Sequence, residues 1–193
     1  MLTPETTHLS DRKGFLKRAC YRAEQFFQAL TAYVHPEELE IVRDYLPPVG
    51  VFLFLSMPRQ DQRHSLDVLY SLQQNGFDNP DLLAAALLHD VGKAEGGRLR
   101  LWHRIIIVLL RATRPDWLVW LGSGTAFYPG SWRHPFYIHL NHPARSALLA
   151  ESVGCSPLTV ELIQRHQDPL PPEADRSAIE KLLAAFQIAD DKH

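Results

Sequence analysis

The 193-residue chain has few of the features that mark secreted or membrane proteins. Its two cysteines, Cys20 and Cys155, lie far apart and form no C-x-x-C pair, so neither a disulfide framework nor a zinc knuckle is expected. The first residues lack the basic and apolar regions of a secretory signal. No uninterrupted apolar run approaches the roughly 20 residues that a membrane-spanning helix needs. We therefore expect a cytoplasmic protein without a transmembrane segment.

An excess of charge of either sign is also missing. The chain has 20 basic and 22 acidic residues and a formal net charge of −2. Because nucleic-acid binding depends on cationic surfaces, no nucleic-acid partner is expected. The 46% content of hydrophobic residues excludes a disordered chain, and the length fits one domain.

Alternating strand patterns are absent as well, whereas helical spacing recurs along the chain. The all-α prediction rests on helices over 10–34, 36–46, 60–75, 81–88, 143–153, 156–166 and 177–191. Asn79-Pro80, Ser156-Pro157 and Ser177 with Glu180 supply N-terminal caps. The helix over 81–88 is apolar on nearly all sides and should be the central one. The apolar stretch 49–56 is compatible with helix or strand.

The segment 96–138 has an unusual composition. Its first part is apolar with interleaved arginines, and its second part is rich in aromatic residues. Such a segment could lie on a membrane surface. The sequence favours a packed lid or a buried pair of helices over this alternative.

Side chains that bind divalent metals lie at or near the ends of different predicted helices. They are His64, His89, Asp90, His142, His166 and Asp190, with Asp191 as an alternative to Asp190. Imidazole nitrogens combined with carboxylate oxygens suit iron, manganese, zinc or nickel. Arg63 could meet a phosphate, whereas His103, His134 and His139 are expected at the surface or in packing.

This ordered set, with the sequence His89-Asp90-Val91-Gly92-Lys93, resembles the dinuclear branch of the HD-domain metal-dependent phosphohydrolases. The resemblance covers residues 60–191. It implies that His64, His89, Asp90 and Asp190 form the core ligands, that Asp90 bridges two divalent ions, and that His142 and His166 complete the second site. Asp90 and Lys93 are the implied catalytic residues, with Lys93 close to the phosphate.

The resemblance also implies an activity and a domain organisation. A metal-activated hydroxide would hydrolyse a phosphomonoester or phosphodiester, with a nucleotide as the expected small phosphorylated substrate. Residues 60–193 would form the HD-type core with an insert at 96–138, and residues 1–59 a helical extension packed on it. Two positions depart from the family pattern, where Ser146-Ala147 replaces Gly-Ala and His166-Gln167 replaces His-His. Two alternatives remain, a di-iron oxygenase on the same scaffold and a non-catalytic helical signalling module.

Overall fold

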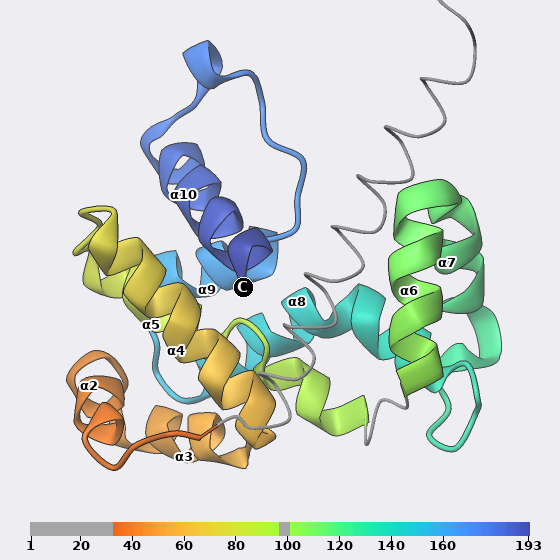
Figure 1. Ribbon diagram of the computed structural model, residues 1–193, viewed down its shortest axis with the longest axis horizontal. Coiled ribbons are helices and arrows are strands. Elements are labelled where there is room, and N and C mark those ends of the chain that lie inside the picture. The colour runs from red at the N-terminus through yellow and green to blue at the C-terminus, as the bar shows by residue number, and fades with distance from the viewer. Residues whose placement is uncertain (1–32, 97–100) are drawn as a thin grey trace, which may run out of the picture.

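The computed structural model describes residues 33–96 and 101–193. The helix predicted over 10–34 therefore lies outside the described residues, apart from its last two positions. Within the described ranges the regular structure is helical and contains no strand, which confirms the all-α prediction (Figure 1).

The α-helices follow one another with short connections. They are α2 (Glu38–Tyr45), α3 (Pro48–Ser56), α4 (Arg59–Gln74), α5 (Pro80–Leu88), α6 (Leu101–Thr113), α7 (Pro115–Leu121), α8 (His134–Ser152), α9 (Pro157–Arg165) and α10 (Ala178–Lys192). Three short 3-10 helices connect them: η1 (Val91–Gly96), η2 (Gly124–Phe127) and η3 (Glu173–Asp175). The stretch 49–56, which the sequence left open between helix and strand, is helical in α3.

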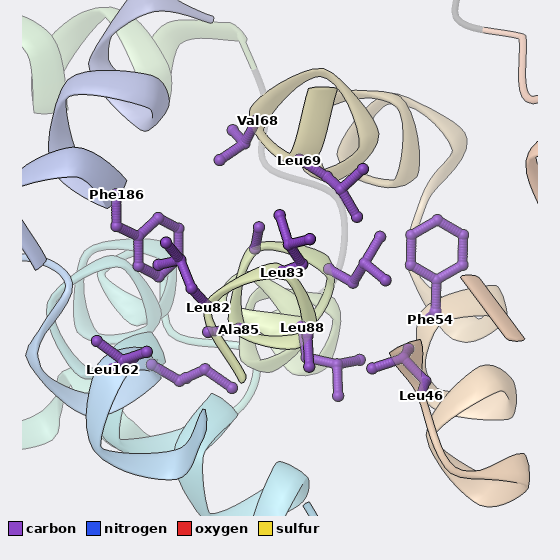
Figure 2. Close-up of a cluster of buried hydrophobic side chains, with 14 of the residues drawn as sticks. Leu46, Phe54, Val68, Leu69, Leu82, Leu83, Ala85, Leu88, Leu162 and Phe186 are labelled. Carbon is purple, nitrogen blue, oxygen red and sulfur yellow. The ribbon is translucent and has the colours of Figure 1, made fainter. Parts of the chain in front are cut away.

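Helix α5 is the centre of the core, as its composition predicts. Every residue from Leu82 to Leu88 is buried. Figure 2 shows α5 nearly end-on, with Leu46 and Phe54 on one side and Leu162 and Phe186 on the other. A helix buried all round cannot satisfy polar side chains, which explains its uninterrupted apolar sequence.

The predicted caps fix where α5, α9 and α10 begin. The Asn79 side chain accepts hydrogen bonds from the backbone N–H groups of Asp81 and Leu82. Ser156 accepts from the N–H of Thr159, and Ser177 forms a capping box with Glu180. Because each cap satisfies N–H groups that the first helical turn leaves unpaired, it sets the start of the helix. The N-terminal ends of α5 and α9 lie beside one another, since Ser156 and Thr159 both hydrogen-bond to Asp81.

The helix predicted over 143–153 is wrong at its start. Helix α8 begins at His134, and Pro143 lies in its interior instead of near its first turn. Proline usually marks a helix start because it has no N–H group to donate to the preceding turn. Here the carbonyl that Pro143 leaves unpaired, that of His139, has another donor, described below.

Helices α6 and α7 form a pair at one side of the molecule, joined to the rest through α8 (Figure 1). Ile107, Leu118, Leu121 and Phe136 make a small core of their own beneath the pair. The expected packing of two helices in the 96–138 segment is thus present, but much of the outer face stays exposed to solvent. None of the described helices combines the length and the apolarity needed to cross a membrane.

Candidate metal centre

The side chains expected to bind metal come together from five parts of the fold. His64 projects from α4, the adjacent His89 and Asp90 follow α5, His142 lies on α8, His166 caps the C-terminus of α9, and Asp190 lies on α10. His89, Asp90, His142 and His166 are almost completely buried. A buried group of this composition could hold a metal ion.

One side of the cluster is formed by His64, His89 and Asp190. The Oδ1 atom of Asp190 lies 2.9 Å from Nε2 of His64 and 3.4 Å from Nε2 of His89. The rings of the two histidines are 5.3 Å apart between centroids. The neighbouring Asp191 is exposed, so the structure places Asp190, and not Asp191, against the histidines.

Asp90 connects this side to the other. Its Oδ1 atom lies 3.5 Å from Nε2 of His89 and 3.4 Å from Nε2 of His142, and its Oδ2 atom lies 3.8 Å from Nε2 of His64. Two groups of three potential ligands share Asp90: His64, His89 and Asp90 form one, and Asp90, His142 and His166 form the other. Within each group, the ligand atoms lie within 4.8 Å of one another.

Three of the histidines are oriented in the same way. The Nδ1 atom of each ring lies close to the backbone carbonyl three residues earlier, at 3.0 Å for His89, 2.7 Å for His142 and 2.6 Å for His166. A carbonyl can only accept, so Nδ1 carries the proton and donates. Nε2 is then left as the atom that faces the cluster, which is the arrangement in which protein histidines bind metals.

The carbonyls that accept these bonds are ones that the helices leave unpaired. Those of Ala86 and Ile163 lie in the last turns of α5 and α9, where no following N–H group completes the helical bond. That of His139 is unpaired because its helical partner would be Pro143, which has no N–H. The sequence His142-Pro143 therefore frees a carbonyl and supplies the imidazole that satisfies it.

Several polar atoms in the cluster have no hydrogen bond of good geometry. Nε2 of His89, Oδ1 of Asp90 and Nε2 of His166 are fully buried without one, and they are three of the five such side-chain atoms in the described residues. A buried polar atom left unsatisfied costs about 1–3 kcal/mol, so a concentration of such atoms favours the binding of a ligand that satisfies them. Two imidazole nitrogens and a carboxylate oxygen are the donor set that a divalent transition metal prefers.

The charges of the cluster are strongly coupled. Burial opposes ionisation of Asp90, but the neighbouring charges of His89 and Lys93 outweigh it and hold the pKa of this carboxyl well below its usual range. Burial also opposes ionisation of Asp190, and hydrogen bonds from His64 and His89 outweigh it and lower the pKa of that carboxyl. Burial lowers the pKa of His89, yet the two carboxylates more than compensate and raise it. A cation that displaced the His89 proton would take over this balancing charge.

The pKa values of His142 and His166 are lowered, whereas that of His89 is raised. Burial, with some repulsion from neighbouring positive charge, lowers the pKa of His142 and lowers that of His166 to about 3. Both rings are neutral at pH 7, so each offers an unprotonated Nε2 lone pair without first losing a proton.

The contact between η1 and α8 sets the distance between Asp90 and His142. Gly92 lies so close to α8 that an added Cβ would be 2.9 Å from the His142 carbonyl oxygen and 2.9 Å from the Ser146 nitrogen. The Gly92 N–H donates to the buried Ser146 Oγ at 2.9 Å. Ser146 thus allows close packing of η1 on α8 and adds a hydrogen bond across the contact.

Some polar residues near the motif lie outside the cluster. The Arg63 guanidinium binds Glu38 at 2.7 Å and Asp67 at 2.8 Å, which ties α2 to α4 instead of directing Arg63 to a phosphate. His103 and His134 contact the backbone carbonyls of Trp132 and Ala126, in agreement with packing roles.

The prediction that all the potential ligands lie near helix ends is wrong for His142. This residue lies in the middle of α8, because the proline that follows it does not start the helix. His64 is on the sixth residue of α4, and only His89, His166 and Asp190 are close to C-terminal ends. The cluster therefore combines three helix ends with two helix sides.

A pocket of about 280 Å³ lies beside His142, and one of its lining residues, Arg145, was not singled out in the sequence. Phe127, His134, Tyr137 and Arg145 contribute to its walls, together with His142 itself. His139, expected at the surface or in packing, also lies beside His142: the two rings are 5.9 Å apart, and burial lowers the pKa of His139 to about 3. His139 and Arg145 are each three residues from His142, a spacing that makes them neighbours on one helix face once α8 is known to be continuous.

The chain was also compared with protein-family models, with curated proteins and with solved structures, and none of the three comparisons gives a match. The geometry thus defines a buried His/Asp cluster on an all-α fold that could hold a metal ion.

Proposed function

We propose that the protein is a metal-dependent phosphohydrolase acting on phosphomonoesters or phosphodiesters. The observation that carries the proposal is the sharing of Asp90 by two groups of histidine ligands, with the ammonium group of Lys93 beside them. A shared carboxylate is suited to holding two cations close together, as enzymes that hydrolyse phosphoesters require.

The residues that would hold the metals form two groups that share Asp90. His64, His89 and Asp190 would serve one ion, His142 and His166 the other, and Asp90 both. When bound, such ions supply a nucleophile from water at neutral pH and offset the charge of the phosphate. The Nδ1 bonds to backbone carbonyls would keep His89, His142 and His166 in place, since they fix both tautomer and ring orientation.

Lys93 supports phosphate as the reacting group. Its Nζ atom lies 2.6 Å from Oδ2 of Asp90, and 26% of its side chain is exposed to solvent. A compact cation at the open edge of a ligand cluster suits an anionic substrate. Oxygenation of a neutral compound would have no use for this charge, so the proposal ranks hydrolysis above the di-iron oxygenase.

The pocket beside His142 supports a substrate with a planar group. Phe127, His134 and Tyr137 provide aromatic walls, and Arg145 provides a cation. The volume of about 280 Å³ fits a small ligand. We therefore propose a nucleotide, or another small aryl phosphate, as the substrate.

Phosphate release with purified, metal-reconstituted protein tests the proposal. The substrates are p-nitrophenyl phosphate, bis-p-nitrophenyl phosphate and a set of nucleotides, each assayed with and without chelator. We expect chelator-sensitive hydrolysis that is lost in His166→Ala and kept in His35→Ala, a control in which the histidine is exposed and outside the cluster. Oxygen consumption without phosphate release would favour the oxygenase. Metal binding with neither reaction would favour a non-catalytic module.

A further inference from the structure

The outer surface of α6 and α7 is the most apolar exposed region of the described chain. Ten of the sixteen large hydrophobic side chains that are exposed lie between residues 102 and 132. They are Trp102, Ile105, Val108, Leu109, Trp117, Val119, Trp120, Phe127, Tyr128 and Trp132. Soluble domains rarely leave so many large apolar side chains together in water, so the region is expected to have a partner.

These side chains follow the helix period. On α6 the exposed residues Trp102, Ile105 and Leu109 are spaced three and four apart and form one stripe, while Ile107 faces the small core beneath. On α7, Trp117 and Trp120 are each 62% exposed and are three residues apart, whereas Leu118 and Leu121 are buried. Each helix thus has an inner apolar face that is packed and an outer apolar face that is not.

Positive charge predominates in the same region. Residues 101–133 contain four arginines and a single aspartate, with no lysine or glutamate, although the whole chain has a net charge of −2. Arg111 and Arg114 are exposed at the turn between α6 and α7, close to Trp117. Arg133 instead lies over the ring of Trp120, at 4.7 Å from its centroid, and bonds to carbonyls at the end of α7.

We propose that the α6–α7 pair is a docking surface for an anionic lipid bilayer. Tryptophan is favoured at the boundary between headgroups and acyl chains, and arginines are attracted to anionic headgroups. Helix α6 has 13 residues and is about 20 Å long, shorter than the roughly 30 Å hydrocarbon core, so it lies in the interface plane. Two copies of the surface would bring their arginines together, so the charge favours lipid over self-association.

Intrinsic fluorescence of the unmodified protein tests this proposal directly, because all four tryptophans of the chain lie in this region. Indole emission moves to shorter wavelength when the ring leaves water. The probe is a vesicle of phosphatidylserine and phosphatidylcholine in equal parts, with pure phosphatidylcholine for comparison. We expect a blue shift and co-sedimentation with the anionic vesicles, and both should weaken as salt is added.

Two variants separate the apolar and the electrostatic contributions. Leu109→Ser/Trp117→Ser should lower the vesicle partition coefficient about tenfold or more, because two large side chains no longer enter the interface. Arg111→Glu/Arg114→Glu should lower it by at least about tenfold on anionic vesicles and leave the weak binding to neutral vesicles unchanged. Leu148→Ser, which removes an exposed leucine of α8 outside the region, is the matched control and should bind like the wild type.

The proposal is overturned if anionic vesicles neither shift the fluorescence nor carry the protein to the pellet. A wild-type emission that is already blue without lipid would indicate that the surface is covered by residues 1–32. A dimer in light scattering that Leu109→Ser/Trp117→Ser dissociates, without vesicle binding, would assign the surface to a second copy of the chain. Either result would replace the lipid as the occupant, independently of any enzymatic activity.

Discussion

Helix α8 contacts two regions in which side chains are distributed in opposite ways. On one of its sides His142 is buried in a cluster in which Oδ1 of Asp90 and Nε2 of His166 lack hydrogen bonds. On the other it supports the α6–α7 pair, where Trp117 and Trp120 are mostly exposed. Buried polar atoms without partners and exposed apolar side chains both cost free energy in the isolated chain. The unpartnered polar atoms around His142 indicate a cation as the ligand, whereas the exposed tryptophans of the α6–α7 pair indicate an apolar surface.

A third region shows what a satisfied polar network looks like in the same fold. Arg63 binds Glu38 and Asp67, and the Tyr70 hydroxyl donates to Glu38 at 3.0 Å. Burial raises the pKa of Glu38, but the bonds from Arg63, His35 and Tyr70 outweigh it and lower the pKa overall. Because its charges are paired within the chain, this network needs no ligand, and it provides the reference for the two other regions.

The largest expected effect is at the centre of the metal cluster. His89→Ala removes a nitrogen that lies within 3.5 Å of both the buried Asp90 carboxylate and the half-buried Asp190 carboxylate. We expect loss of bound metal and no phosphate release above background, because the ligand set is incomplete. Elemental analysis and the phosphate assay measure the two losses together. Full activity in a variant that holds no metal would break the assignment of the cluster.

The next largest effect is at Gly92. Gly92→Ala places a methyl group 2.9 Å from backbone atoms of α8, so η1 and α8 must separate and Asp90 must move relative to His142. Overpacking of this kind costs about 1–3 kcal/mol of the free energy of unfolding. Urea denaturation measures it, and we also expect weaker metal binding. In the control Gly50→Ala the added Cβ meets only side-chain atoms, at 3.2 Å or more, so stability should stay within about 1 kcal/mol of the wild type.

Ser146 offers a smaller and more local change at the same contact. Ser146→Ala removes the acceptor of the buried Gly92 N–H without adding any volume. An unsatisfied buried donor costs about 1–3 kcal/mol. Ser152→Ala, on the same helix but exposed, should cost no more than about 0.5 kcal/mol. Equal effects in the two variants, compared by chemical denaturation, would show that the Gly92 bond does not hold η1 against α8.

The smallest effect concerns the satisfied network and depends on pH. The folded-state pKa of Glu38 lies below its ordinary value of 4.5, so the ion pair contributes stability above that pH, and the contribution is lost as pH falls through the folded pKa. Glu38→Gln should therefore be less stable than the wild type at neutral pH, and the difference should shrink in acid. Denaturant titrations of both proteins over this range measure it. A difference that does not change with pH would contradict the ion-pair account.

Much of the fold could be predicted because local signals agreed with the tertiary structure. Asn79-Pro80 and the uninterrupted apolar run after it specify both the start of α5 and its burial. The types and order of the potential metal ligands could also be read, since few other roles explain a buried His89-Asp90 pair beside further histidines. In these places, capping chemistry and side-chain type determine the structure over a few residues.

Other features depend on contacts that the sequence does not show. Pro143 predicts a helix start, yet α8 continues because the His142 imidazole replaces the missing donor to the His139 carbonyl. Helix α6 is apolar on more than one face, and periodicity alone does not tell which face the fold covers. The need for glycine at position 92 arises only when η1 meets α8, more than 50 residues later in the chain.

The central claim is that the His/Asp cluster is a metal centre with Asp90 shared by two ions. Metal content per chain, measured by elemental analysis after purification without chelator and again after reconstitution, tests it most directly. The account predicts a ratio near two, as a dinuclear centre requires, and near zero in His89→Ala. A reconstituted, folded wild-type protein that retains no metal would contradict it.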